Sequence, residues 1–467
     1  MNHRYQQLAF ELAQQIDTGV YAHGMRLPGV RTLCAQRGVS AATVVAAYRK
    51  LEDEGYLEAR SRSGFYVRAR HTIAAIESAL GEAAAPRLVS HRDMAMTLIK
   101  AANDVGMVQL GAAVPDASYL PMSAIARAEA QVMRRESRRA AGYMMPPGAP
   151  ELTRQIARRM NEAGARVRAA DIMITTGCQE ALSLALRATT RPGDVVAVES
   201  PSFYGLLHAL EALGLEALEI PLHPRDGLSL EALELALDRW PVKACVVTPN
   251  FSNPLGACMP EIRRRALIAL LARHHVPLIE DDVYGELGFS AIQPLSCKAL
   301  APTADILYCS SFSKSLAPGL RVGWIAAGAR HAEIEYLKYV TSIATPSLPQ
   351  LAVAELLENG RFDRHLREVR GHYARAVARM SEAVMRLFPE GTRISQPQGG
   401  FVLWLELSDT KVDSFELARC ALTRGVSIAP GSLFSASGKY ANYLRLSCAR
   451  PWDAALERAL VTLAGLV

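Results

Sequence analysis

Hydrophobic positions near the start of the chain recur with the period of a helix. In YQQLAFELAQQID, the residues Leu8, Leu12 and Ile16 lie four positions apart, which places them on one helical face. The next segment, LPGVRTLCAQRG, predicts a short second helix that ends at Gly38, because glycine is the preferred residue just beyond a helix C-terminus. Two consecutive short helices are therefore expected in the first 40 residues.

A third helix and a hairpin complete this first region. Ser40 is a favourable N-cap, and the helix after it carries apolar residues from Val44 to Leu51 on one face. The segment YLEARSRSGFYV then alternates about a Ser-Gly turn, a pattern that predicts two paired strands. Three helices followed by a hairpin indicate a winged helix-turn-helix domain in residues 1–70.

The pattern changes beyond an Ala-rich stretch, which we expect to be a linker over residues 71–100. Short apolar runs (DIMITT, DVVAVES, ACVVTPN, VPLIEDD, ILYCSS, VGWIAAG) then alternate with amphipathic helical segments. Such runs predict an α/β fold, with a mostly parallel, doubly wound sheet covered on both faces. The body is expected to span residues 101–467, with a large domain at about 140–345 and a smaller α+β domain at about 346–467.

The charge is concentrated in the first region. The 467 residues include 52 Lys or Arg and 46 Asp or Glu, a net charge of +6, and 50% are apolar, which excludes a disordered or fibrous chain. Residues 1–70 hold ten bases and six acids, a net +4, and the remaining 397 residues hold 42 bases and 40 acids, a net +2. Two thirds of the excess positive charge thus lies in the predicted helix-turn-helix.

Cysteine usage and apolar segments bear on the compartment. None of the eight cysteines forms a C-x-x-C pair, so they are expected to be reduced thiols, and no metal site is predicted. The N-terminus lacks the apolar core of a signal peptide, and no stretch has the ~18–20 apolar residues of a membrane span. We therefore expect a cytoplasmic protein with no membrane partner.

Lys314 stands in the strongest local motif of the body, SSFSKSLAPGLRVGW. It follows an apolar strand, at the end where ligands bind in doubly wound sheets, and Arg321 lies seven residues further on. A lysine in such a place becomes a nucleophile when burial or positive neighbours lower its pKa, and hydroxyls with an arginine suit a phosphate. These parts predict a lysine that forms a Schiff base with a phosphorylated aldehyde. A lysine near serines, taken alone, is more often a solvated surface residue.

Other strand ends supply groups that such a ligand needs. Asp281 follows a strand and would keep a pyridine nitrogen protonated, and Tyr284 lies three residues on. Asn253 precedes a proline in a turn, TTGCQEAL joins a strand to a helix N-terminus that suits an anion, and an aromatic pair follows Pro201. Each also has an ordinary explanation: a helix cap, turn chemistry, a common strand-to-helix connection or core packing.

The order and wording of these segments over about residues 105–450 resemble the fold-type I aminotransferases that use pyridoxal 5′-phosphate. The resemblance implies Lys314 as the Schiff-base lysine, Asp281 as the partner of the pyridine nitrogen, and Phe203 as the ring-stacking residue, with Tyr204 as its alternative. It also implies a homodimer. The remaining implied contacts are Asn253 and Tyr284 for the ring hydroxyl; Gly177, Cys178, Gln179, Ser311, Ser313, Arg321 and Tyr143 (from the other subunit) for the phosphate; and Arg445 and Gly111 for a substrate or effector.

Residues 4–68 resemble the winged helix-turn-helix of GntR-type bacterial regulators, and a GntR head on an aminotransferase-like body is the architecture of the MocR subfamily. The resemblance implies binding to double-stranded operator DNA, with the helix after Ser40 in the major groove. It also implies a homodimer, head-to-tail, in which each head lies on the partner's body. The expected DNA contacts are Arg31, Ser40, Thr43, Arg49, Arg60 and Arg62. Ala41 and Ala42 stand where the subfamily often has larger polar residues.

Two main functions remain open from the sequence. The first is a transcriptional regulator that holds pyridoxal 5′-phosphate through a lysine aldimine and senses the cofactor or an amino compound. The second is a metabolic aminotransferase with a vestigial head, because every residue expected for transamination is present. A third hypothesis, in which the body only dimerises a repressor, leaves Lys314, Asp281 and Asn253 unexplained together. The sequence favours the regulator.

Overall fold

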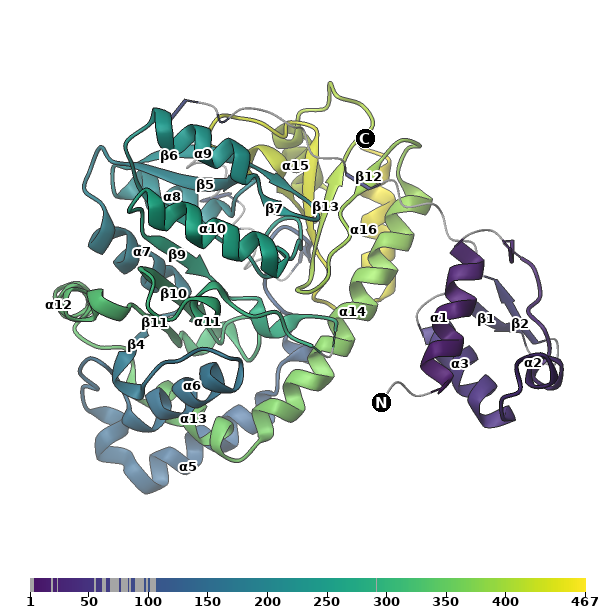
Figure 1. Cartoon of the computed structure of the whole chain (residues 1–467), viewed down its shortest axis with the longest axis horizontal. Helices are drawn as coiled ribbons and strands as arrows, with labels where there is room; N and C mark the ends of the chain where they lie inside the picture. The colour runs from purple at the N-terminus through teal and green to yellow at the C-terminus, as the bar shows by residue number, and fades with distance from the viewer. Residues whose placement is uncertain are drawn as a thin grey trace. The chain divides into compact units, whose positions relative to one another are not determined.

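The structure is a computed structural model that describes residues 4–17, 20–22, 24–53, 56–60, 64–67, 75–76, 83, 85–88, 96–97, 100, 106–290 and 292–467. It divides into two compact units, Met1–Ile73 and Ala74–Val467 (Figure 1). Arg62 and most of the expected linker lie outside the described residues.

The first unit has the predicted elements. Helices α1 (Arg4–Asp17), α2 (Val30–Arg37) and α3 (Ala41–Asp53) precede an antiparallel hairpin of β1 (Leu57–Arg60) and β2 (Gly64–Val67). The apolar residues that define the three helical faces share one buried core with the inner side of the hairpin. The prediction of a winged helix-turn-helix is confirmed.

The turn between α2 and α3 is built as its sequence predicts. Gly38 ends α2 with a positive φ of 61°, and its N–H donates to the carbonyl of Cys34. The side chain of Ser40 accepts a hydrogen bond from the N–H of Thr43 at 3.2 Å, which makes it the cap of α3. This turn sets the angle between the two helices.

The second unit contains an eight-stranded sheet in the order β4-β11-β10-β9-β8-β5-β6-β7. Strands β6, β5, β8, β9 and β10 run parallel, whereas β11 is antiparallel to β10 and β4, and β7 is antiparallel to β6. The bounds are β4 (Ile172–Thr175), β5 (Val195–Ser200), β6 (Glu216–His223), β7 (Gly227–Leu228), β8 (Val242–Val247), β9 (Leu278–Asp281), β10 (Ile306–Ser311) and β11 (Gly323–Ala326). The predicted mostly parallel sheet is confirmed.

Helices cover both faces of this sheet (Figure 1). Alternate residues of β5 face opposite ways: Val196 and Val198 pack with α7 (Cys178–Thr189) and α8 (Tyr204–Ala212). Val195 and Ala197 pack on the other side with α9 (Leu230–Arg239) and α10 (Glu261–Arg273). The continuous apolar runs of the sequence follow from this burial on both faces.

The C-terminal part forms a second, antiparallel sheet. Its strands are β12 (Arg393–Ile394), β13 (Val402–Glu406), β15 (Ala429–Pro430) and β16 (Tyr443–Ser447) in the order β12-β13-β16-β15. The helices that share its core are α14 (Arg361–Leu387), α15 (Ser414–Thr423) and α16 (Ala454–Ala464). A further parallel pair joins β3 (Val108–Gln109) to β14 (Val426–Ser427). The chain near residue 110 is therefore held beside the C-terminal sheet.

Helices that are distant in sequence enclose the far end of the large sheet. Helix α13 (Ser347–Glu358) shares a core with α5 (Met122–Ala141), α6 (Pro150–Glu162) and the β4–β11 edge. None of the described helices is both long and apolar enough to cross a membrane.

Candidate cofactor-binding site

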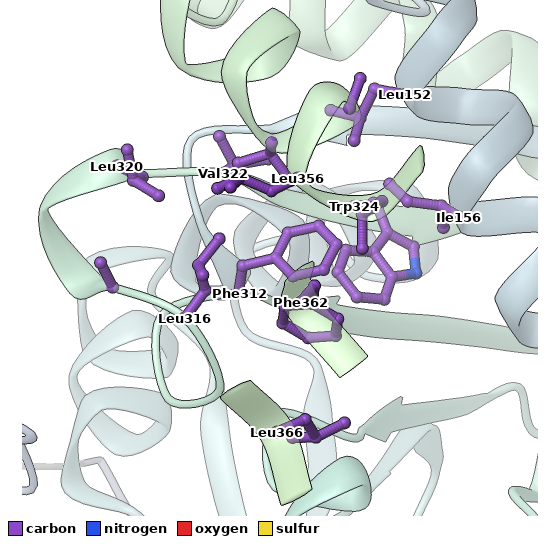
Figure 2. Packing of buried hydrophobic residues seen from close by; sticks show 14 of the residues in the cluster. Leu152, Ile156, Phe312, Leu316, Leu320, Val322, Trp324, Leu356, Phe362 and Leu366 are labelled. Carbon is purple, nitrogen blue, oxygen red and sulfur yellow. The ribbon is translucent and has the colours of Figure 1, made fainter. Parts of the chain in front are cut away.

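Lys314 lies in a turn whose flanking residues on either side are buried in the hydrophobic core. Phe312 and Leu316, two residues before and after it, are buried against Trp324 and Phe362 (Figure 2). The intervening Lys314 side chain donates a hydrogen bond from Nζ to the carbonyl of Ala113 at 2.5 Å. The turn therefore fixes the direction of the amine at the carboxyl end of β10.

The environment of Lys314 favours its neutral form. Burial lowers its pKa to about 8, and the positive charges of Arg445 and Arg321 act in the same direction. The negative charge of Asp281 opposes this shift. A lysine with such a pKa has a substantial neutral fraction near physiological pH, which is the nucleophilic form.

Asp281 ends the neighbouring strand β9 and is 8% exposed. Its Oδ1 accepts from the thiol of Cys178 at 3.4 Å and from the N–H of Val283 at 3.3 Å. Burial raises its pKa to about 6, while these hydrogen bonds and Lys314 lower it. The carboxylate is thus buried, and a positively charged N–H group could donate a further hydrogen bond to it and balance its charge.

Two buried polar atoms near this carboxylate have no hydrogen-bond partner in the described part of the chain: the hydroxyl of Tyr284 and Nε of Arg445. Burial raises the pKa of Tyr284, and the charge of Arg445 opposes that shift. Arg445 donates from Nη1 to Oδ1 of Asn253 at 3.3 Å and from Nη2 to the carbonyl of Gly111. Tyr284, Asn253, Gly111 and Arg445 therefore form one polar group that retains bonding capacity.

The N-terminus of α7 forms an anion cradle with Arg321. Gly177 caps the helix with a φ of +80°, and a Cβ there would lie 2.5 Å from Nη2 of Arg321. Arg321 donates to the carbonyl of Thr176 at 3.0 Å and to Oγ of Ser313 at 3.5 Å. The first N–H groups of a helix lack intrahelical acceptors, and the close approach of Arg321 to Gly177 places the guanidinium beside these groups.

The remaining expected ligand contacts differ in their placement. Ser311 accepts from the N–H of Ser313 at 3.4 Å, beside the cradle. Gln179 donates to the carbonyl of Gly205 at 2.8 Å, and the Phe203 ring lies so close to Gly205 that a Cβ there would be 2.4 Å from it. Tyr143, in contrast, is 81% exposed, and the structure shows no contact between it and the cradle.

The expected DNA contacts lie on the surface of the first unit. Arg31 and Arg49 are exposed, and no described residue pairs with either side chain. Thr43 is within 2.8 Å of the Ser40 hydroxyl. Arg60 is bound to Glu58, with Nε 2.7 Å from Oε1, and stacks on the ring of Tyr66 with 4.4 Å to its centroid.

Comparison with known proteins identifies both units. Residues 4–67 match the gntR family of bacterial regulatory proteins, and residues 106–463 match aminotransferase class I and II. The chain is 40% identical to the uncharacterized HTH-type transcriptional regulator YjiR of Escherichia coli, over 98% of this chain and 97% of that protein. It is 39% identical to YdcR of the same organism, over 99% of each.

The chain belongs to the GntR-type regulators that carry an aminotransferase class I and II domain.

Solved structures resemble the aminotransferase body of this regulator. LysN, an alpha-aminoadipate aminotransferase of Thermus thermophilus in complex with N-(5′-phosphopyridoxyl)-L-leucine, superposes with a TM-score of 0.74 at 30% identity, covering 80% of this chain and 94% of that chain. Kynurenine aminotransferase of Pyrococcus horikoshii gives 0.75 at 29% identity, covering 81% and 94%. The expected fold-type I body is therefore confirmed.

The aminotransferase family implies pyridoxal 5′-phosphate as the cofactor of this regulator, and the residues present fit it. The unpartnered hydroxyl of Tyr284 suits the ring hydroxyl, and the buried Asp281 suits the pyridine nitrogen. The first N–H groups of α7 and the guanidinium of Arg321, which lies against Gly177, suit the phosphate. The donor and acceptor types thus match each part of the cofactor.

Two charged residues of this regulator, one buried and one mostly buried, escaped sequence reasoning. Glu180, in the first turn of α7, is paired with Lys338 of α12 (His331–Ser342), with Nζ 2.8 Å from Oε2. Glu180 lies within TTGCQEAL, but that motif was interpreted only through its glycine and its helix N-terminus, and Lys338 stands in none of the motifs. A charged residue on an amphipathic helix ordinarily faces water. A lysine in a chain with only eight of them was the one available signal.

Proposed function

We propose that this chain is a transcriptional regulator of the MocR subfamily that binds pyridoxal 5′-phosphate covalently through Lys314 and senses the cofactor or an amino compound. The observation that carries the proposal is the setting of Lys314. Its amine has a pKa lowered to about 8 and lies within electrostatic range of Asp281, Arg321 and Arg445, in a chain that also holds a DNA-binding head.

When bound, the cofactor supplies an aldehyde that combines with primary amines and a ring that withdraws electrons. The chain's own residues would divide the remaining work. Lys314 supplies the neutral amine, Asp281 keeps the ring nitrogen protonated, and Phe203 covers the ring. Asn253 and Tyr284 would hold the ring hydroxyl, and the phosphate would bind Gly177, Cys178, Gln179, Ser311, Ser313 and Arg321.

Arg445 indicates the class of effector. Its guanidinium is fully buried, yet Nε has no partner among the described residues. A guanidinium binds a carboxylate well through two parallel hydrogen bonds. Beside the guanidinium of Arg445, Gly111 presents only its backbone, since it has no side chain. We infer that the effector is an amine that also carries a carboxylate, such as an amino acid.

The regulatory step would be a change in the state of Lys314. An amine that takes the place of the lysine at the cofactor frees the Lys314 amine. The free amine titrates with a pKa of about 8, so its charge differs from that of the lysine attached to the cofactor. If one conformer of the body binds the freed lysine better, the effector shifts the population of conformers and thereby the aim of the heads. A homodimer with swapped heads would carry that shift to the DNA. The exposure of the Tyr143 side chain supports a second copy of the chain packed against the surface that carries Tyr143.

Operator binding under four conditions tests this function: no addition, cofactor, amino acid, and both together. DNA from upstream of the chain's own gene and its genomic neighbours provides the probe, and Lys314→Ala provides the matched control. We expect affinity or DNA bending to depend on the cofactor in the parent protein and to lose that dependence in Lys314→Ala. Equal binding under all conditions would refute the sensing function.

Aminotransferase activity is the second candidate, and the buried Arg445 beside Asn253 and Lys314 favours it, because a bound amino acid would lie over the same lysine. Mixing the cofactor-loaded protein with single amino acids and following the cofactor's absorbance measures the half-reaction. Conversion to the amino form at rates of ~1 s⁻¹ or more would support an enzyme. Slower conversion, together with effector-dependent DNA binding, would support the regulator.

A further inference from the structure

The ion pair of Glu180 with the buried Lys338 adjoins the anion cradle, since Glu180 stands in the first turn of α7. Lys338 has a side chain that is 1% exposed, and its Nζ lies 2.8 Å from Oε2 of Glu180 and 2.8 Å from Oγ of Ser342. Ser342 in turn donates to Oε1 of Glu180 at 2.7 Å. Both oxygens of the carboxylate are therefore held by α12.

The same carboxylate also binds the peptide that precedes the cradle. The N–H of Thr176 donates to Oε2 of Glu180 at 2.5 Å. The carbonyl of Thr176 accepts from Nη2 of Arg321 at 3.0 Å. One residue thus connects the ion pair to the guanidinium that faces the anion site, and the chain of contacts runs Lys338, Glu180, Thr176, Arg321.

The negative charge of Glu180 disfavours the binding of an anion at the cradle. Burial raises the pKa of Glu180, but the hydrogen bonds from Lys338, Thr176 and Ser342 outweigh burial and leave the pKa below its ordinary value. Glu180 is thus a carboxylate in the first turn of α7, where the helix dipole also favours an anion. A phosphate bound at the same helix end would be repelled by it unless a cation neutralised the carboxylate.

We propose that Lys338 is a positioning residue for phosphate binding: it neutralises Glu180, the carboxylate that binds the N–H of Thr176 beside the anion cradle. This inference rests on the proposed function, because the phosphate in question is that of the cofactor. It assigns a role to a residue of α12 that would touch neither the phosphate nor any other part of the cofactor.

Two ligands and three variants test the proposal. The ligands are pyridoxal 5′-phosphate and pyridoxal, which carries the same aldehyde and ring without the phosphate. The variants of the full chain are Lys338→Met, Glu180→Gln, and the two combined. Lys411→Met, which removes an exposed positive charge elsewhere, is the matched control. Dissociation constants for both ligands are measured by absorbance, and folding of each variant is checked by circular dichroism.

The expected results differ in sign between the single variants. Lys338→Met should weaken pyridoxal 5′-phosphate binding about tenfold, because it leaves an uncompensated carboxylate near the phosphate. Pyridoxal binding should be unchanged. Glu180→Gln should bind the phosphorylated ligand as well as the parent or more tightly, since the repelling charge is gone. The double variant should return close to the parent affinity, and Lys411→Met should equal the parent.

A merely structural pair predicts another outcome. If both single variants lose affinity for both ligands by similar factors, and the double variant is no better, the ion pair supports the fold and the proposal is wrong. An unchanged affinity of Lys338→Met for pyridoxal 5′-phosphate would also overturn it. Failure of the parent protein to bind pyridoxal 5′-phosphate is a separate result, which would refute the proposed function instead.

Discussion

The thiol of Cys178 donates a hydrogen bond to the Asp281 carboxylate, with Sγ and Oδ1 3.4 Å apart. Cys178 begins α7 at the anion cradle, and Asp281 ends β9. Burial raises the pKa of the thiol, so Cys178 is a neutral donor and not a thiolate. Cys178, which is expected at the phosphate, thus donates through its side chain to Asp281, which is expected at the ring nitrogen.

We predict that Cys178→Ala raises the pKa of Asp281 above its present value of about 6, because a hydrogen bond to the charged form is lost. Cofactor binding needs the carboxylate, so affinity should fall as the pH drops through that pKa, and the midpoint should move upward in Cys178→Ala. Measuring cofactor affinity at a series of pH values between 5 and 8 gives this midpoint. Cys178→Ser should behave like the parent, as should the exposed Cys420→Ala.

The ionised Asp281 carboxylate should lower the free energy of unfolding of the cofactor-free protein. Its folded pKa of about 6 lies above the ordinary 3.8, so the native state binds the proton more tightly. Stability therefore falls as the pH rises from about 4 to about 6, and the full cost is present above that range. Asp281→Asn should stabilise the protein at pH 8 by up to ~3 kcal/mol and have little effect below pH 4.

Urea unfolding of the body at pH 8 and at pH 4 compares the two proteins. Asp281→Asn should also lose cofactor binding at every pH, because the amide cannot balance a protonated ring nitrogen. A variant that is less stable than the parent at pH 8 would show that the hydrogen bonds of Asp281 outweigh its desolvation.

Much of the fold follows from local patterns. The cap at Ser40, the four-residue spacing from Leu8 to Ile16 and the apolar runs of the central strands need only neighbouring residues to be interpreted. Strand β6 was missed because its pattern contains Glu219, a carboxylate that the folded chain buries. Two of the donors that make this burial tolerable, the N–H of Ala436 and the hydroxyl of Ser437, lie more than 200 residues away, and the hydroxyl of Ser200 on the neighbouring strand also donates.

The site shows the same division between local and distant information. Lys314 and Asp281 each follow a strand, so their positions could be inferred from the carboxyl ends of the strands. The orientation of β11 could not, because VGWIAAG is equally apolar in either direction. Lys338 could not be found either, since only the folded chain shows that its helix turns it toward Glu180 and away from water.

The amine of Lys314 sets a pH dependence for cofactor attachment. Its pKa is lowered to about 8, mainly by burial and next by Arg445. The neutral amine increases as the pH rises, so the rate of covalent attachment should rise and level off above about pH 8. Removing the positive charge in Arg445→Met should move this midpoint upward, as measured by stopped-flow absorbance. The same midpoint in both proteins would contradict the assigned influence of Arg445.

Gly111 should tolerate no side chain. A Cβ there would lie 2.6 Å from Oγ of Ser427 and 2.9 Å from the backbone of Ile428. Gly111→Ala should lower the free energy of unfolding by ~1–3 kcal/mol and displace the carbonyl that binds Arg445. Thermal unfolding and amino acid affinity measure the two effects. Gly319→Ala is the control, because nothing lies within 4 Å of its Cβ and it should leave both unchanged.

The arginines of the head should differ in their contribution to DNA binding. Arg31 and Arg49 are exposed, and no described residue pairs with them, so each is available to a phosphate. Arg60 is already held by Glu58 and by the ring of Tyr66. Each phosphate contact contributes about 0.9 to the slope of log affinity against log salt concentration. Arg31→Ala and Arg49→Ala should each reduce that slope by about 0.9, and Arg60→Ala should reduce it by less.

The salt dependence separates this electrostatic role from damage to the fold. A misfolded head would lose affinity at every salt concentration, whereas loss of one phosphate contact weakens binding most at low salt and flattens the slope. Arg458→Ala, an exposed arginine of α16, controls for the general loss of one charge and should keep the parent slope. If Arg60→Ala flattens the slope as much as Arg49→Ala, the hairpin arginine leaves Glu58 to bind the DNA, and the pairing in the free protein does not limit it.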